Sequence, residues 1–131
     1  MTREKLPKPA VLVVDDEPLI RWSLSEGLGE SGFVVRLASS GAEARAALTA
    51  CADEGVVVLL DMRLPDVVDL SLLREIRQRW PAVPVVIMTA HGTLEDQAKA
   101  VELGAFRFVD KPFDVGEIAS VVADAWAHRP A

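Results

Sequence analysis

Residues 56–61 read Val-Val-Val-Leu-Leu-Asp, an uninterrupted apolar run that ends in a carboxylate. A run of this kind, rich in β-branched residues, is typical of a strand buried on both faces, as in the centre of a parallel sheet. The proline of Met62-Arg63-Leu64-Pro65 then favours a turn. Because ligands bind at the carboxyl ends of the strands in open parallel sheets, Asp61 is the first candidate for a reactive residue.

Four more apolar runs predict strands, and helical patterns separate all of them. We expect these strands at residues 10–14, 33–37, 85–88 and 106–109. In the stretches between, apolar residues recur every three or four positions, as Ile20, Leu24 and Leu28 do. Strands that alternate with helices through short connections imply right-handed crossovers. The sequence therefore predicts an α/β fold, a parallel sheet with helices on both faces.

Polar residues before the helical stretches predict where the helices begin. The expected N-terminal caps are Ser40 paired with Glu43, Asp69, Thr93, and Asp114 paired with Glu117. The helix after Asp69 is expected to turn inward its four apolar residues Leu72, Leu73, Ile76 and Trp80. The helix after Thr93 is expected to place Ala98 and Val101 against the core.

Length and composition favour one soluble domain. The 131 residues suit a single core, and the net charge of −6 argues against a nucleic-acid surface. The one cysteine, Cys51, falls in a helical core pattern and fits a reducing compartment. No apolar run approaches the roughly 20 residues that span a bilayer, and no signal-peptide pattern is present. We expect a cytoplasmic domain at residues 10–127, an N-terminal extension at 1–9 and the start of a linker at 128–131.

The expected sheet brings a charged group of residues to one edge. The ends of the first, third, fourth and fifth strands carry Asp15 with Asp16, Asp61, Thr89 and Lys111. Three neighbouring carboxylates raise at least one pKa unless a cation lies among them, and Mg²⁺ prefers such oxygen ligands. A lysine and a hydroxyl can hold a phosphoryl group. Together the residues suggest Mg²⁺-assisted phosphoryl transfer onto Asp61.

Each of these residues also has an ordinary explanation when it is taken singly. Asp15 and Asp16 can cap the first helix, because acids favour a helix N-terminus. Thr89 can be a plain strand residue, and Lys111 a surface charge. Only the gathering of all of them at one edge favours a site.

Four segments of the chain resemble the receiver domain of bacterial two-component response regulators. They are 13–17 (Val-Val-Asp-Asp-Glu), 60–65 (Leu-Asp-Met-Arg-Leu-Pro), 89–92 (Thr-Ala-His-Gly) and 111–114 (Lys-Pro-Phe-Asp). The combination most resembles the nitrogen-regulator (NtrC) subfamily. The resemblance covers nearly the whole chain. It implies the CheY-like, flavodoxin-like, doubly wound (βα)5 fold, a three-layer sandwich with a five-stranded parallel sheet in the order 2-1-3-4-5.

The resemblance also implies roles for single residues. Asp61 would be the phosphoacceptor, and the metal would be Mg²⁺, with Mn²⁺ able to substitute. The remaining implied roles are metal ligation by Asp15, Asp16, Asp61 and the main-chain carbonyl of Met62, phosphoryl contact by Lys111, switching by Thr89 and Phe108, modulation by Arg63 and His91, and a cis peptide bond between Lys111 and Pro112. Phe108 can alternatively be a permanent core residue.

As a receiver, the domain would catalyse only its own phosphorylation and dephosphorylation, and would not be an enzyme on an external substrate. A sensor histidine kinase would phosphorylate Asp61 and so switch the face formed by the fourth helix, fifth strand and fifth helix (residues 94–126). The expected result is a changed homodimer or a changed contact with an output domain, in transcriptional regulation, without nucleic acid or membrane bound by this domain.

Other functions fit the same fold. A phosphorylation-independent interaction module is the alternative, although the chain retains the acids and the lysine that degenerate receivers lose. A flavin or dinucleotide binder would need a glycine-rich loop after the first strand. A haloacid-dehalogenase-type phosphatase would need an aspartate where Arg63 stands.

The chain departs from the receiver pattern in the loop after Asp61. The family usually has Asp-Gly where this chain has Val68-Asp69. Because the glycine would give easy access to a positive φ angle, we expect this loop to follow another path.

Overall fold

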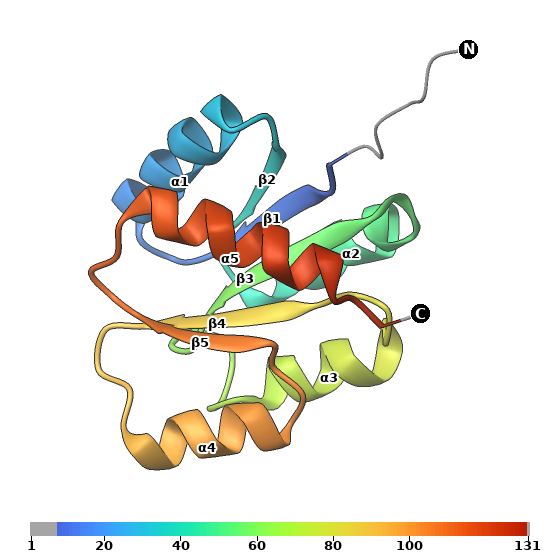
Figure 1. Ribbon diagram of the computed structural model, residues 1–131. Helices are drawn as coiled ribbons and strands as arrows, with labels where there is room; N and C mark the ends of the chain where they lie inside the picture. Colours follow the sequence, from blue (N-terminus) through green and yellow to red (C-terminus); the bar gives the residue numbers. More distant parts are fainter. Residues whose placement is uncertain (1–7, 131) are drawn as a thin grey trace.

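The computed structural model describes residues 8–130, so residues 1–7 of the expected extension and residue 131 of the expected linker lie outside it. Strands and helices alternate along the chain (Figure 1). The strands are β1 (Ala10–Val14), β2 (Val34–Ala38), β3 (Val56–Asp61), β4 (Val85–Thr89) and β5 (Arg107–Asp110). The helices are α1 (Pro18–Glu30), α2 (Gly41–Cys51), α3 (Ser71–Arg79), α4 (Leu94–Glu102) and α5 (Val115–Ala127), with a short 3₁₀ turn at Ala52–Glu54.

The five strands form one parallel sheet in the order β2-β1-β3-β4-β5, which confirms the expected fold. Every residue of β3 is buried, as its apolar run predicts for the central strand. Helices α1 and α5 cover one face of the sheet, and α2, α3 and α4 cover the other (Figure 1). Cys51, the last residue of α2, lies in the core, as predicted.

The ends of several strands differ slightly from the expected positions. β2 and β5 each begin and end one residue later than predicted, and β4 extends to Thr89. Phe33 precedes the β2 ladder yet is buried against α1, so its apolar character reflects the core rather than strand pairing. The shift keeps each strand's carboxyl end at the same edge of the sheet.

Two helix caps differ from the predictions. Asp69 does not cap α3: Leu70 is the N-cap residue, and Asp69 adopts a positive φ of 47° just before it. Ser40 accepts a hydrogen bond from the Glu43 N–H as predicted, but the Glu43 carboxylate accepts from the N–H and hydroxyl of Ser39 instead of from Ser40. The predicted cap at Thr93 and the capping box at Asp114 with Glu117 are confirmed.

The predicted inner face of α4 is wrong. Ala98 is exposed, Val101 is 58% exposed, and the residue of α4 that packs into the core is Ala100. Leu94 is 85% exposed, so α4 presents a stripe of three apolar residues to solvent. The periodicity correctly indicated a helix, but the spacing of apolar residues does not tell which side of the helix faces the sheet.

The predicted inner face of α3 holds for three of its four residues. Leu72, Leu73 and Ile76 are buried, whereas Trp80 follows the end of the helix and is half-buried beneath the Arg79 guanidinium.

Within residues 8–130, none of the helices has the length and hydrophobicity needed to cross a bilayer.

Candidate functional site

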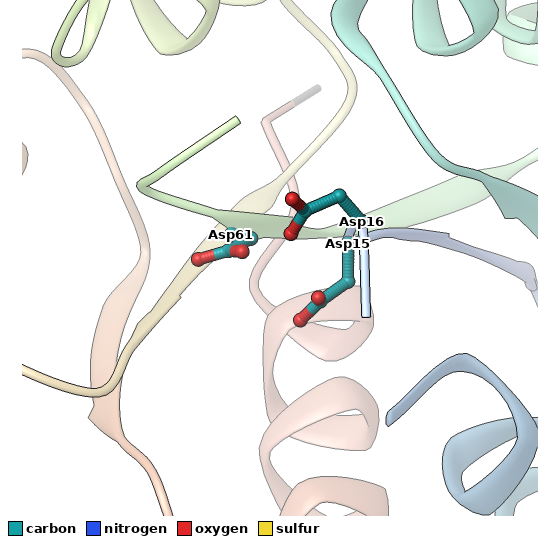
Figure 2. A group of neighbouring side chains, drawn as sticks. All are labelled: Asp15, Asp16 and Asp61. Atoms are coloured by element: carbon teal, nitrogen blue, oxygen red, sulfur yellow. The ribbon is translucent and has the colours of Figure 1, made fainter. Parts of the chain in front are cut away.

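The carboxyl ends of neighbouring parallel strands bring the predicted site residues together. Asp15 and Asp16 follow β1, Asp61 ends β3, and Thr89 ends β4. Figure 2 shows the carboxylates of Asp15, Asp16 and Asp61 turned toward a common space. One oxygen from each of these three groups lies within 4.8 Å of the others. Because β1 and β3 pair in register, with Val14 opposite Leu60, the following acids come face to face.

Burial differs sharply among the three acids. The side chain of Asp15 is fully buried and Asp61 is 6% exposed, whereas Asp16 is exposed. The buried acids also hold the loops that follow them. Asp15 Oδ1 accepts a hydrogen bond from the Glu17 N–H at 2.9 Å, and Asp61 Oδ1 accepts one from the Arg63 N–H at 3.2 Å. The site is therefore accessible to solvent at Asp16 and shielded from solvent at Asp15.

Lys111 lies inside this acidic group and is not a surface charge. Its side chain is 9% exposed, and Nζ lies 2.7 Å from Asp15 Oδ2 and 3.7 Å from Asp61 Oδ2. Nζ also contacts Glu17 Oε1 at 2.9 Å. Sequence reasoning assigned no role to Glu17, although its place beside Asp15-Asp16 was a signal. The peptide bond between Lys111 and Pro112 is cis, and the Lys111 N–H donates to the Thr89 carbonyl.

The electrostatics of the site make ionisation of Asp61 harder than for an ordinary aspartate. Burial, together with the nearby Asp15 and Asp16, raises the pKa of Asp61 to about 6, against the opposing effects of the Arg63 N–H and Lys111. Burial lowers the pKa of Lys111, but its hydrogen bonds to Asp15 and Glu17 outweigh this, and the net pKa is raised. The single ammonium group of Lys111 is thus shared among the carboxylates of Asp15, Glu17 and Asp61. This excess of negative charge favours the binding of a further cation.

The donor set fits a hard divalent cation. The three carboxylates offer oxygen ligands from two adjacent strands, and the exposed Asp16 leaves room for water or a phosphoryl oxygen. Met62, whose main-chain carbonyl the resemblance assigns to the metal, directly follows Asp61 and is anchored by its own N–H, which donates to the Met88 carbonyl. His91, in contrast, lies in the β4–α4 loop and belongs to none of the metal-ligand groupings among the described residues.

Thr89 and its neighbours form the second part of the site. The Thr89 side chain is fully buried, and its hydroxyl lies 3.4 Å from the His91 N–H. Arg63 Nη2 lies 3.4 Å from the His91 carbonyl, so the two predicted modulating residues join the loops after β3 and β4. Phe108 is half-buried on β5, opposite Ile87 in the pairing with β4.

The loop after Asp61 contains an anchor that local sequence patterns do not reveal. The Asp66 carboxylate accepts hydrogen bonds from the N–H groups of Gly41 and Ala42 at 2.8 and 3.0 Å, at the first turn of α2. Those bonds hold the pKa of Asp66 below its usual range. Three residues later, Asp69 takes the positive φ that a glycine would take more easily, as aspartate tolerates.

Comparison with known proteins identifies the family of this chain. The model of the response regulator receiver domain matches residues 11–123. The DNA-binding transcriptional regulator NtrC of Escherichia coli (strain K12) is 41% identical over 118 residues, which cover 90% of this chain and 25% of that protein. The response regulator protein PilR of Pseudomonas aeruginosa is 41% identical over 125 residues, 95% of this chain and 26% of that protein. The chain thus spans about a quarter of the length of these curated relatives.

Solved structures agree with this assignment. The receiver domain of NtrX from Brucella abortus superposes with a TM-score of 0.83 at 34% identity, over 90% of this chain and 98% of that one. The beryllofluoride-activated NtrC4 receiver domain dimer superposes with a TM-score of 0.79 at 32% identity, over 90% and 96% of the two chains. With the family model covering nearly all of the described residues, the chain belongs to the response regulator receiver domain family, and its curated relatives include NtrC regulators.

Proposed function

We propose that Asp61 accepts a phosphoryl group from the phosphohistidine of a sensor histidine kinase, in a reaction supported by Mg²⁺ at Asp15, Asp16 and Asp61. The observation that carries the proposal is the meeting of these three carboxylates within 4.8 Å, beside a buried lysine. In the proposed step, an Asp61 carboxylate oxygen forms a bond to phosphorus, the phosphorus–nitrogen bond of the donor breaks, and the imidazole leaves with a proton from solvent.

The residues of the chain have distinct parts in this step. Lys111, already 3.7 Å from Asp61 Oδ2, offsets the charge that a phosphoryl group adds. The Thr89 hydroxyl, at the end of the adjacent strand, is the donor for a phosphoryl oxygen. Mg²⁺ held by the three carboxylates would supply positive charge that offsets the charge of the phosphoryl group. Ionisation of Asp61 is required of a nucleophile, and both cations favour it.

The exposed apolar stripe of α4 supports a contact surface that responds to phosphorylation. Leu94 and Val101 are 85% and 58% exposed, and Ala98 lies exposed between them. Among the described residues, α4 places only Ala100 fully in the core, so the helix has few contacts that resist movement. We propose that phosphorylation alters the face formed by α4, β5 and α5, and with it a homodimer or a contact with an output domain.

The names of the relatives support a proposal about the wider role. The matched NtrC proteins are named DNA-binding transcriptional regulators and are about four times longer than the matched region. We propose that this domain regulates a DNA-binding output domain in the cytoplasm, and that it catalyses its own phosphorylation and dephosphorylation without acting on an external substrate. Mn²⁺ is expected to replace Mg²⁺, because the ligands are all oxygen atoms.

Beryllofluoride binding tests the assignment of Asp61. We expect ¹⁹F NMR to show protein-bound fluoride when beryllofluoride and Mg²⁺ are added, and none with Asp61→Asn. The matched control is Asp53→Asn, an exposed acid in the 3₁₀ turn after α2, which should bind as the parent does. Bound fluoride that persists in Asp61→Asn would refute the assignment.

A further inference from the structure

Gly92, in the loop between β4 and α4, lies where any side chain would collide with two residues of the proposed switch. A Cβ atom built at this position lies 2.5 Å from Cζ and 2.6 Å from Cε1 of the Phe108 ring. It also lies 2.6 Å from the Cγ2 methyl of Thr89. Non-bonded carbon atoms pack at about 3.5 to 4.0 Å, so this position has no room for even a methyl group.

The need for glycine at this position is steric. In the described residues, positive φ angles occur at Gly32, Gly55, Gly104 and Asp69, and not at Gly92. The backbone of residue 92 is therefore open to other amino acids, and only the neighbouring side chains exclude them. Those neighbours come from the ends of two paired strands, β4 and β5.

The two side chains approach the same point from different directions. Phe108 extends from β5 toward the face of the sheet that α4 covers, and its ring packs against the core on that side. Thr89 is the last residue of β4, just before the loop. The loop passes over the tip of the ring at Gly92, so the end of the ring and the Thr89 methyl group both lie within 2.6 Å of the place that a Cβ atom of residue 92 would take.

We propose that Gly92 is a positioning residue of the switch, which keeps open the space where the Phe108 ring lies beside Thr89. A side chain at position 92 would move the ring away from Thr89 or lift the loop. Either change would alter how Thr89 and Phe108, the two residues of the proposed switch, lie relative to each other, and would so shift the equilibrium on which phosphorylation is proposed to act. The signalling role rests on the function proposed above, whereas the steric role concerns the unmodified protein.

The other close glycines have different neighbours. A Cβ atom at Gly27 would meet Val115 of α5, and one at Gly41 would meet Val67 of the β3–α3 loop. Neither touches Thr89 or Phe108. At Gly29, on α1, such a Cβ would meet no atom within 4 Å beyond its chain neighbours and the backbone of its own helix, and Gly29→Ala is therefore the matched control.

A double-variant cycle tests the steric role. Gly92→Ala, Phe108→Ala and the double variant are compared by ¹³C methyl NMR of Thr89 in the unmodified 131-residue protein. In the parent and in Gly29→Ala, we expect the ring current of Phe108 to displace the Thr89 methyl signal. Gly92→Ala should lose this displacement as fully as Phe108→Ala does, and the double variant should match Phe108→Ala.

Several outcomes would overturn the proposal. A parent-like Thr89 signal in Gly92→Ala would show that the ring does not move. An equal effect of Gly92→Ala with and without the ring would show that it acts on the loop alone. If Gly92→Ala unfolds, recovery of folding in the double variant supports the collision with Phe108, and failure of both to fold contradicts it.

The signalling role is tested by adding beryllofluoride and Mg²⁺ to the same samples. We expect the change in the Thr89 signal to be smaller in Gly92→Ala than in the parent, and an equal change would refute a role in the switch. If the parent binds beryllofluoride but the cycle shows no coupling, only this inference fails. If the parent binds none while the cycle shows coupling, the proposed function fails and the steric role of Gly92 stands.

Discussion

Asp61 is the residue at which the competing demands of folding and function are clearest. Its burial and the two nearby acids raise its pKa to about 6, while its proposed role needs the ionised carboxylate. Between the unfolded value of 3.8 and about 6, the folded protein binds more protons than the unfolded chain, so its stability falls as pH rises through that window.

Asp61→Asn should therefore be more stable than the parent without divalent cations. We expect a gain of about 1 to 3 kcal/mol near pH 7 and little difference near pH 4, where the parent carboxyl is mostly neutral. Urea unfolding at both pH values measures this difference. Addition of Mg²⁺ should stabilise the parent and not the variant. Equal stability of the two proteins near pH 7 would show that ionised Asp61 does not destabilise the folded protein.

Lys111 is the counterpart of the buried acids. Lys111→Met keeps most of the apolar stem but leaves Asp15, which is fully buried, without its cation. We expect the free energy of unfolding to fall by about 3 kcal/mol near pH 7, because a buried charge loses its partner. Mg²⁺ should recover part of this loss and bind more tightly than to the parent, since the ammonium no longer competes.

Calorimetric titration with Mg²⁺ and urea unfolding test both effects of Lys111→Met. The control is Lys99→Met, on the exposed surface of α4. Weaker Mg²⁺ binding in Lys111→Met than in the parent would contradict a shared cation site.

At the scale of single residues, the sequence located the acids, Thr89 and Lys111 because each directly follows a recognisable strand. It did not reveal Asp66, since that carboxylate acts on the N–H groups of Gly41 and Ala42, far away in sequence. The place of Glu17 beside Asp15 and Asp16 was a signal, but its contact with Lys111 depends on the distance between two loops, which the sequence does not give.

At the scale of elements, the β3–α3 loop is fastened to α2 and thereby braces the segment that begins at Asp61. Asp66 binds the first turn of α2, and Val67 packs where a Cβ atom at Gly41 would lie. Acids at a helix N-terminus satisfy N–H groups that the helix itself leaves free. The β3–α3 loop is held by hydrogen bonds to α2, which is distant in sequence, and the residue pattern of the loop alone does not predict this attachment.

Asp66→Ala should release this attachment. We expect a lower urea midpoint, and weaker Mg²⁺ binding because the Met62 carbonyl lies on the same loop. Asp53→Ala, an exposed acid that bonds no helix terminus in the described structure, should change neither quantity. Because the pKa of Asp66 is lowered, its contribution should also fade as pH drops below the ordinary aspartate range. Unchanged midpoint and Mg²⁺ affinity in Asp66→Ala would contradict the bracing role.

The existence and order of every strand and of the five α-helices were predictable from the sequence. The errors concern which residue caps α3 and which side of α4 faces the core. Asp69 is not a cap because the backbone turns left-handed at that residue, a conformation set by the whole loop. The stripe on α4 is apolar yet outward, because helical spacing is the same whether a stripe faces the core or solvent.

At the scale of the whole molecule, one edge of the sheet carries the charged site, and helix α4 carries an exposed apolar stripe. Exposed apolar residues that lie together on one helix are typical of an interaction surface. The stripe of Leu94, Ala98 and Val101 begins next to the loop that follows Thr89. Changes at Thr89 can therefore reach α4 through a short connection.

Val101→Glu should prevent any dimer that beryllofluoride and Mg²⁺ induce, because it puts a charge into the stripe. Light scattering after size exclusion should show a monomer for this variant under conditions that dimerise the parent. Leu19→Glu, at an exposed apolar site on α1, is the control and should still dimerise. A dimer in Val101→Glu, or a monomer in Leu19→Glu alone, would place the contact elsewhere.

The most direct test of phosphoryl transfer to Asp61 is intact mass after incubation with acetyl phosphate. We expect the parent to gain the mass of one phosphoryl group when Mg²⁺ is present, to gain none when Mg²⁺ is chelated, and Asp61→Asn to gain none in either case. A gain in Asp61→Asn would mean that another residue is the acceptor, and no gain by the parent with Mg²⁺ would contradict the proposed phosphorylation switch.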